Sequence, residues 1–514
     1  MTGFDQETRR PGDLVPGHAA IAGTARAMFV KPLPAEHPLD LLGLGAIPDL
    51  LPPHVIDEVI AECGRQEQRV RALPARIALY FTLALWFCPG QGYAEVLRVL
   101  FRQLRDDLRA GRWRIPTVSA AVKARRRLGR EPLKALFRRL RGPHADPGEP
   151  GMSAFGLPVA MLKVSVDGTC LDVADTAANR AAFGAPPRNG KGATGPFPKI
   201  RLLTLIASGT RTILEAVWAP FATGELTLLS KLVGLGVLRP GMLVLADRYF
   251  SGHPQVAQVI ATGADLIFRA HNHRHLPALT ELPDGSYLSV LPSANLPTKG
   301  DLHRAGGRHC PRLSLRQRQA RGLRIRVVEA VITVIGEQGE TRTESYLLIT
   351  TLLDHVLAPA AKIAELYHER WESETGYADL KTYLRGRQHI LRSKSPNGVA
   401  QELYALLIVY QLVQITRSRA ARAHPDQIGL DPDRVSFTVT LRALVRSIGD
   451  TATAGRLLHD VFEEVWAQPL LQRRPRAKPH EIKGTAAFVR AIQKTPPGNV
   501  TYTITPRQPH ASPA

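Results

Sequence analysis

The chain has 514 residues and carries 67 Lys and Arg against 45 Asp and Glu, a formal net charge of +22 at pH 7. A surface this basic favours a polyanionic partner, because binding releases the counterions of that partner. The four cysteines have no paired spacing, no signal-peptide pattern begins the chain, and the longest apolar stretch, Ile77–Cys88, is too short for a bilayer. These features exclude a disulfide framework and predict a soluble cytoplasmic protein without a membrane segment.

The first predicted elements are helices. Residues 1–35 are polar and interrupted by Pro and Gly, which predicts an irregular arm, and residues 36–145 predict a helical domain. The segment from Arg65 to Arg141 holds 19 basic and five acidic residues, so its net excess of 14 positive charges predicts the first contact with DNA. A helical, arginine-rich domain that does not bind DNA fits the same residues.

Two basic helices close this domain, and they are predicted over Val118–Leu128 and Pro132–Arg141. A glycine separates them, which suits a helix-turn-helix motif. In that motif Arg125, Arg126 and Arg127 would face phosphate, although three consecutive helical residues point in different directions.

From residue 154 the pattern changes to short strands. Apolar alternation and turn residues predict the order β-β-β-α-β-α-β over residues 154–270. Strands are expected at Leu162–Val173, Ile200–Ala207, Thr212–Ala219, Met242–Asp247 and Asp265–Arg269, and helices at Glu225–Leu235 and Pro254–Thr262. Asp167 lies within the first strand, and Asp247 closes an apolar run that is typical of a strand buried on both faces.

Residues 271–345 predict a β-rich insertion. Strand-like runs separated by Gly, Pro and Arg lie at Tyr287–Val290, Arg324–Ile335 and Ser345–Thr350. The same stretch holds a group of possible zinc ligands: His271, His273, His275, His303, His309 and Cys310. Their spacing differs from that of structural zinc sites, so contact with phosphate or simple surface exposure fits them better.

The most informative pattern is a Y-x2-R-x3-E-x6-K spacing within a helix predicted from about Pro359 to Arg385. At about 100° per residue, one narrow face of this helix carries Tyr367, Arg370, Glu374 and Lys381. A solvated face with i,i+3 and i,i+4 charge pairs gives the same pattern. The two strand aspartates favour a functional interpretation, because with Glu374 they supply three carboxylates that suit a two-metal site.

These residues together resemble a known family, the DDE transposases of bacterial insertion sequences, in the insertion-sequence-four group with its Y-R-E-K signature. The matching stretches are Val166–Thr169, Asp175–Gly184, Ala246–Tyr249, Tyr367–Lys381, Leu391–Pro396 and the helical Gln401–Leu407. The resemblance extends over roughly residues 40 to 450.

The resemblance implies an α/β fold with a ribonuclease-H-like catalytic domain, a β-rich insertion before the third carboxylate, and an all-α basic N-terminal domain before both. Residues 154–270 would form the first part of the catalytic core, and residues 346–450 its second part with the Y-R-E-K helix. Residues 451–514 would form a C-terminal region with a basic tail.

The resemblance also implies metal-dependent cleavage at transposon ends and strand transfer into target DNA. Two Mg²⁺ ions, for which Mn²⁺ can substitute, would be held by Asp167, Asp247 and Glu374. Phosphates near the scissile bond would be bound by Tyr367, Arg370 and Lys381.

The implied partners are the inverted-repeat ends of the transposon and the target DNA, bound by a homodimer in the nucleoid of the bacterial cytoplasm. Two rival classes stay open on the sequence. A non-catalytic DNA-binding protein derived from a transposase would keep the basic surface without cleaving DNA. A tyrosine recombinase would attack phosphate with a tyrosine and use no metal, and the H-x-x-R pattern at His271–Arg274 is its support.

Overall fold

The computed structural model describes residues 44–69, 71, 73–111, 113–146, 148–149, 151–155, 160–188, 193–274, 276–293, 322–335, 341–368, 370, 376–377, 379–384, 390–426, 430–448, 456–470 and 501–506. All of them belong to one unit of the chain, Pro38–Ala514. The domain boundaries expected from the sequence remain predictions.

The N-terminal part is helical, as predicted. Its helices are α1 (Ile47–Leu50), α2 (Pro53–Glu62), α3 (Ala75–Phe87), α4 (Tyr93–Leu100), η2 (Phe101–Leu104), α5 (Arg105–Arg109), α6 (Val118–Leu128) and α7 (Glu131–Leu140). Helix α3 is apolar on all sides and therefore buried almost completely. Helix α6 begins where Thr117 Oγ1 accepts a hydrogen bond from the Ala120 N–H at 3.2 Å, and it ends at Gly129, whose φ of 69° favours glycine.

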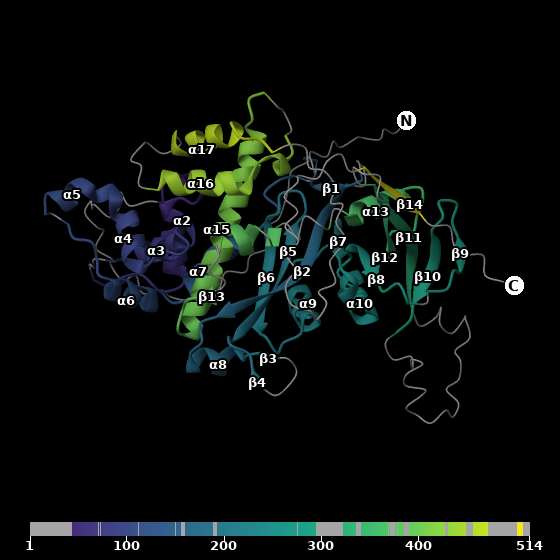
Figure 1. Ribbon diagram of the computed structural model, residues 1–514, viewed down its shortest axis with the longest axis horizontal. Helices are drawn as coiled ribbons and strands as arrows, with labels where there is room; N and C mark the ends of the chain where they lie inside the picture. Colours follow the sequence, from purple (N-terminus) through teal and green to yellow (C-terminus); the bar gives the residue numbers. More distant parts are fainter. Residues whose placement is uncertain are drawn as a thin grey trace, which may run out of the picture. The chain divides into compact units, whose positions relative to one another are not determined.

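Helix α15 (Pro396–Arg422) connects the N-terminal helices to the sheet (Figure 1). On one side the Trp86 indole N–H donates to the Glu402 carbonyl at 2.8 Å. On another side Gln411 Oε1 accepts from the Ile213 N–H at 2.8 Å. By length and composition α15 could cross a membrane, but 94% of its apolar window is buried in the fold, which identifies it as a core helix. Helices α16 (Phe437–Ser447) and α17 (Arg456–Trp466) pack against it.

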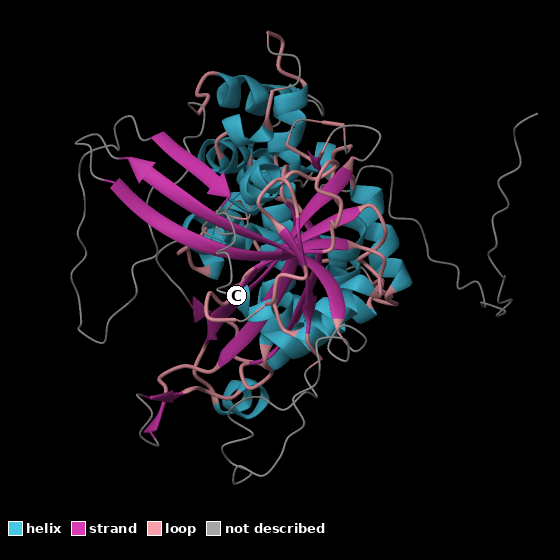
Figure 2. Ribbon diagram, turned by 90° about the vertical axis from the view of Figure 1, so that its right-hand side faces the viewer, coloured by secondary structure: helices cyan, strands magenta, loops and turns pink. Residues whose placement is uncertain are grey.

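A mixed sheet forms the other half of this unit (Figure 2). Within the described residues its main strands, in spatial order, are β6 (Ile213–Pro220), β5 (Lys199–Ala207), β2 (Met161–Val173), β7 (Met242–Ala246), β8 (Asp265–Ala270), β12 (Thr341–Thr350), β11 (Leu323–Ile335), β10 (Tyr287–Leu291) and β9 (Thr280–Glu281). Strands β2, β7 and β8 are parallel, whereas β5 and β6 on one side and β12 to β9 on the other pair antiparallel.

Short strands extend this arrangement. They are β1 (Ser153–Ala154) and β13 (Ile390–Leu391), which pair with β2, β14 (Thr501–Pro506), which pairs with β11, and a separate hairpin of β3 (Pro187–Arg188) and β4 (Ala193–Thr194). All five strands predicted between residues 154 and 270 are confirmed. The strands predicted in the insertion are also confirmed, and they continue the central sheet because β12 pairs with β8.

Helices cover both faces of the sheet. They are α8 (Ala177–Phe183), α9 (Glu225–Gly234), α10 (His253–Ile260) and α13 (Ala360–His368). One apolar layer joins Val244 to side chains of α9 and α10, and the opposite layer joins Leu243 and Leu245 to side chains of α13. Strand β7 is therefore buried on both faces, as its continuous apolar run predicts.

Candidate active site

Two aspartates lie side by side at one edge of the parallel strands. Leu162 pairs with Met242 and Ser165 with Leu245, so the β2–β7 register has an offset of 80 residues. The same offset matches Asp167 with Asp247, the residue that follows β7. Neighbouring strands are about 4.8 Å apart, so the register, continued two residues past its last pair, sets these two half-buried residues opposite each other.

Both carboxylates also project toward the same face of the sheet. Side chains alternate along a strand, and Asp247 has the parity of Leu243 and Leu245, which pack in the layer of α13. Asp167 has the parity of Met161, which packs in the same layer. The two carboxylates therefore lie on the α13 side, on which the Y-R-E-K segment begins.

Local hydrogen bonds orient each carboxylate. Asp167 Oδ1 accepts from the Gly168 N–H at 2.7 Å. Asp247 Oδ1 accepts from the Tyr249 N–H at 2.9 Å and caps the short helix η3 (Arg248–Phe250). Asp167 lies within a strand and Asp247 directly follows one, and a hydrogen bond from a nearby N–H orients each carboxylate. Such fixed carboxylates are suited to holding a ligand in place.

Tyr367 joins α13 to this edge. Its ring meets that of Tyr346 at 5.7 Å, and the Arg370 guanidinium lies 5.8 Å from the Tyr367 ring centre. Burial raises the pKa of the Tyr367 hydroxyl, and Arg370 and Arg269 oppose that rise. The Asp247 carboxylate adds to the rise in the pKa of Tyr367, so it lies within electrostatic range of this hydroxyl. The structure thus places Tyr367 beside Arg370, and the β2–β7 register aligns Asp167 with Asp247.

The helix predicted from about Pro359 to Arg385 is not continuous, which corrects the single-face argument. Helix α13 ends at His368, and Arg370 lies in a turn in which its N–H donates to the Tyr367 carbonyl at 3.0 Å. Further along, η4 (Asp379–Leu384) has the wider turns of a π-helix. An angle of 100° per residue therefore does not apply from one end to the other.

Two predicted site residues are not placed. Glu374 lies outside the described residues. Lys381 belongs to η4, but its side chain lies outside the described part of the chain. Their predicted roles therefore remain predictions.

A basic turn, His271–Arg274, lies within electrostatic range of Asp247, and the sequence predicts phosphate contact or simple surface exposure for its histidines. The rings of His271 and His273 are 5.1 Å apart, directly after β8. Burial lowers the pKa of His271, His273, Arg248 and Arg274 add to that effect, and Asp247 opposes it. The sequence could have indicated that this turn lies near Asp247, because the carboxyl ends of neighbouring parallel strands, here β7 and β8, lie at the same edge of a sheet. The other possible zinc ligands, for which phosphate contact or surface exposure fits better, lie outside the described residues: His275, His303, His309 and Cys310.

The donor set fits a hard divalent cation in part. Carboxylate oxygens are the ligands that Mg²⁺ and Mn²⁺ prefer, and two aspartates meet at this edge. Among the described residues, no group of three or more His, Cys, Asp or Glu side chains is arranged to hold a metal ion. The pair therefore needs a further ligand, for which the sequence offers Glu374.

The predicted phosphate-facing arginines of α6 divide into two groups. Arg125 is buried, its guanidinium lies 5.8 Å from the Tyr93 ring, and Gln401 donates to its carbonyl at 2.7 Å. Arg126 and Arg127 are exposed. The expectation that Arg125 faces phosphate is therefore wrong, because this side chain packs between α6 and α4.

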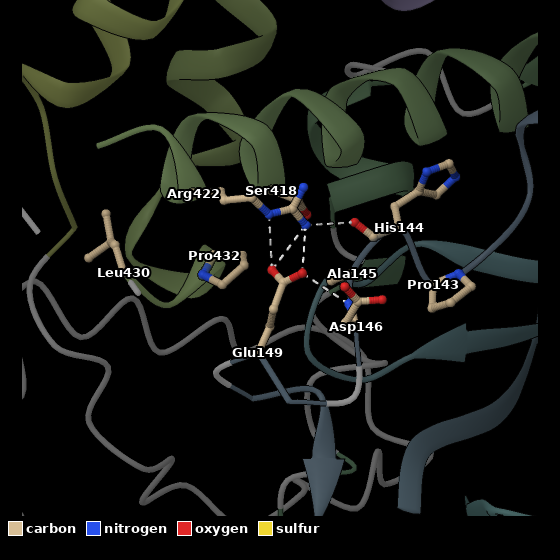
Figure 3. Close-up of a pocket in the computed structure, with 9 residues that line it drawn as sticks. All are labelled: Pro143, His144, Ala145, Asp146, Glu149, Ser418, Arg422, Leu430 and Pro432. Carbon is tan, nitrogen blue, oxygen red and sulfur yellow. Dashed lines mark hydrogen bonds and ion pairs between the residues drawn. The ribbon is translucent and has the colours of Figure 1, made fainter. Parts of the chain in front are cut away.

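A separate cavity of about 680 Å³ lies away from these residues, between α15 and the segment that follows α7 (Figure 3). It contains the ion pair of Arg422 Nη2 with Glu149 Oε1, 2.8 Å apart. No predicted site residue lines it.

Family models and a transposase relative match large parts of this chain. Residues 42–138 match the family model "Insertion element 4 transposase N-terminal", and residues 160–412 match the model "Transposase DDE domain". The chain is 26% identical over 461 residues to transposase InsG for insertion sequence element IS4 of Escherichia coli (strain K12), covering 87% of this chain and 92% of the relative.

A solved structure, a cryo-EM synaptic complex of piggyBac transposase with hairpin DNA, covers 87% of both chains at 11% identity. Its TM-score of 0.34 is too low to establish a shared fold. The two family models and the InsG relative carry the assignment: this chain belongs to the DDE transposases of the insertion-sequence-four family, enzymes of DNA transposition.

Proposed function

We propose that this transposase has a ribonuclease-H-like catalytic core in which the catalytic carboxylates are Asp167, Asp247 and Glu374. The strand and helix order β2, β5, β6, α9, β7, α10, β8 supports the fold, with the first strand between β5 and β7 in the sheet. The β2–β7 register is the observation that carries the site, because it aligns Asp167 with Asp247 on the α13 side.

The three carboxylates would hold two divalent ions, Mg²⁺ by preference. Bound there, the ions would activate a water or a DNA 3′-hydroxyl and stabilise the leaving oxygen. The chain itself contributes orientation. Local N–H bonds hold the carboxylates of Asp167 and Asp247 in place, so that ions bound there would have fixed positions relative to DNA at this edge. The protein forms no covalent intermediate in this scheme.

The cations of the Y-R-E-K segment would bind phosphates near the scissile bond. Arg370 offers a planar fork for a phosphate, and Lys381 offers a point charge. A tyrosine hydroxyl is protonated at neutral pH, and burial raises the pKa of Tyr367 further, so this hydroxyl can donate a hydrogen bond.

Replacement of Arg370 by alanine is expected to slow joining of a pre-nicked end. Removal of one charge-assisted hydrogen bond to phosphate costs about 1.5–3 kcal/mol, or roughly 10- to 100-fold in rate. Lys381→Ala should act in the same direction, and Tyr367→Phe should have a smaller effect. Single-turnover joining beside a Mg²⁺ titration checks this result, because the metal dependence should be unchanged. If Arg370→Ala and Lys381→Ala join DNA as fast as the parent, these cations do not bind the reacting phosphates, and the Y-R-E-K spacing reflects only surface ion pairs.

Exposed cations of the helical part would bind transposon ends. Lys123 and Arg126 on α6 and Arg138 on α7 are exposed and basic. Their replacement by alanine should weaken end binding and reduce the salt slope by about 0.9 for each phosphate that the protein no longer neutralises. The matched control is Arg446→Ala, which removes an exposed arginine that already pairs with Glu464. If the variant that lacks Lys123, Arg126 and Arg138 has the same salt slope as the control, these three residues do not bind the transposon ends.

The test of the proposed function uses a labelled DNA fragment with the inverted repeats that border the gene of this chain. Purified protein should cut the fragment at the transposon end in Mg²⁺ and leave it intact in EDTA. Binding without cleavage in Mg²⁺ or Mn²⁺ would contradict the catalytic proposal. We also propose that a homodimer acts on paired ends in the bacterial nucleoid, which the stoichiometry of the isolated end complex tests.

A further inference from the structure

A buried tyrosine hydroxyl connects the Y-R-E-K segment to the strand of Asp167. The Tyr377 hydroxyl lies 2.5 Å from the Asp167 carbonyl oxygen and 2.7 Å from Thr204 Oγ1. A carbonyl only accepts, so the single hydroxyl proton of Tyr377 goes to Asp167 and the Thr204 hydroxyl donates to Tyr377.

The hydrogen bond from Tyr377 to Asp167 lies just beyond the last residue pair between β2 and β7. The β2–β7 pairs end at Ser165 and Leu245, two residues before Asp167. The Tyr377 hydroxyl therefore bonds the backbone of a proposed metal ligand just past the end of that ladder. Tyr377 follows Glu374 by three residues and precedes Lys381 by four.

The segment that carries Tyr377 is itself packed tightly. A Cβ added at Gly376 would lie 2.8 Å from the Tyr410 hydroxyl oxygen, so only glycine fits there without a shift. Two residues after Tyr377, the Asp379 carboxylate is buried with Arg211, at 3.9 Å between Oδ2 and Nη1. Movement of this segment relative to Asp167 is thus opposed by a hydrogen bond, a close contact and a buried ion pair.

We propose that Tyr377 is a positioning residue that fixes the backbone of Asp167 relative to the segment between Glu374 and Lys381. This positioning role rests on the proposed function, because the proposed function assigns Asp167 to the metal site. Tyr377 touches neither DNA nor metal in this proposal and acts only through Asp167. Its hydroxyl should therefore affect metal affinity and the rate of cleavage, but not the affinity for transposon ends.

The test compares full-length parent and Tyr377→Phe, which keeps the ring and removes the hydroxyl. Mn²⁺ affinity is measured by EPR of the free ion, and cleavage by single-turnover assays at saturating DNA and Mg²⁺. We expect Mn²⁺ affinity at least about 5-fold weaker and cleavage at least about 10-fold slower, with end binding unchanged. Parental Mn²⁺ affinity and cleavage in Tyr377→Phe would overturn the proposal.

Two control variants separate positioning from general loss of a buried bond. Thr204→Val removes the donor to Tyr377 but leaves the Tyr377–Asp167 bond, so its Mn²⁺ affinity should stay near that of the parent. Tyr287→Phe removes another buried hydroxyl, bonded to Glu329 Oε1 at 3.2 Å on the distant strand β11. A loss of Mn²⁺ affinity in Tyr287→Phe equal to that in Tyr377→Phe would also overturn the proposal.

A second perturbation keeps the proposal testable if Tyr377→Phe does not fold. Gly376→Ala should push the segment away from Tyr410 and weaken Mn²⁺ binding, and Gly376→Ala with Tyr410→Phe should restore it, because the clashing oxygen is removed. Parental Mn²⁺ affinity in Gly376→Ala would contradict the positioning role. A parent that binds Mn²⁺ but does not cleave DNA would contradict the proposed function and leave the Mn²⁺ comparison as the test of Tyr377.

Discussion

Replacement of Asp167 or Asp247 by asparagine is expected to lower single-turnover cleavage of a transposon end by at least about 10³-fold. Asparagine keeps the side-chain volume but removes the negative charge that a metal ligand supplies. Binding of the transposon end should be unchanged, because the two residues lie at the metal site in the proposed scheme and not among the exposed cations. Glu374→Gln should behave in the same way.

The matched control for these variants is Asp172→Asn. Asp172 lies on β2 like Asp167, but its parity directs it to the opposite face, and its Oδ1 pairs with Lys199 Nζ at 3.1 Å. Cleavage by Asp172→Asn should stay close to that of the parent. Near-parental cleavage by Asp167→Asn or Asp247→Asn would remove that residue from the site.

A chain that starts at residue 146 is expected not to fold. The core around α15 is shared with the N-terminal helices, because α3 and α7 pack against α15 and their buried side chains belong to the same core as those of α6, α16 and α17. Each large apolar side chain that returns to water costs about 1.5–3 kcal/mol. Net stabilities of domains are only about 5–15 kcal/mol, so exposure of several such side chains exceeds the total. Truncation of the basic region therefore tests folding and not DNA binding alone.

Size-exclusion chromatography and thermal unfolding of residues 146–514 check this expectation. The fragment should aggregate or unfold without a cooperative transition, whereas co-expression with residues 44–145 should restore a folded complex. A monomeric 146–514 fragment with a cooperative transition near that of the full chain would show that the helical part is an independent domain.

Much of the sheet could be predicted from the sequence because its signals are local. Alternation marked β2, the continuous apolar run marked β7, and turn residues marked their ends. The two aspartates stood out because each carboxylate interrupts or ends an apolar strand. Their alignment could not be predicted, since register between strands that are 80 residues apart depends on tertiary packing.

Three features depended on contacts that no local pattern contains. Helix α13 ends at His368 although the following residues suit a helix, and propensity is a weak guide to helix ends. Arg125 is buried although its neighbours Arg126 and Arg127 are exposed, because Tyr93 and Gln401 supply partners. The Tyr377 bond to the Asp167 carbonyl joins residues 210 positions apart in the chain.

Strand joining distinguishes a metal-dependent transposase from an enzyme that attacks DNA with a tyrosine. A labelled, pre-cleaved transposon end with a free 3′-hydroxyl is incubated with supercoiled target plasmid and either parent or Asp247→Asn, and the products are separated on a denaturing gel. We expect the parent to form a protein-free joint between end and plasmid in Mg²⁺ or Mn²⁺, and we expect EDTA or Asp247→Asn to abolish this product. Joint molecules formed in EDTA, or DNA linked covalently to a tyrosine of the protein, would contradict the metal-dependent mechanism.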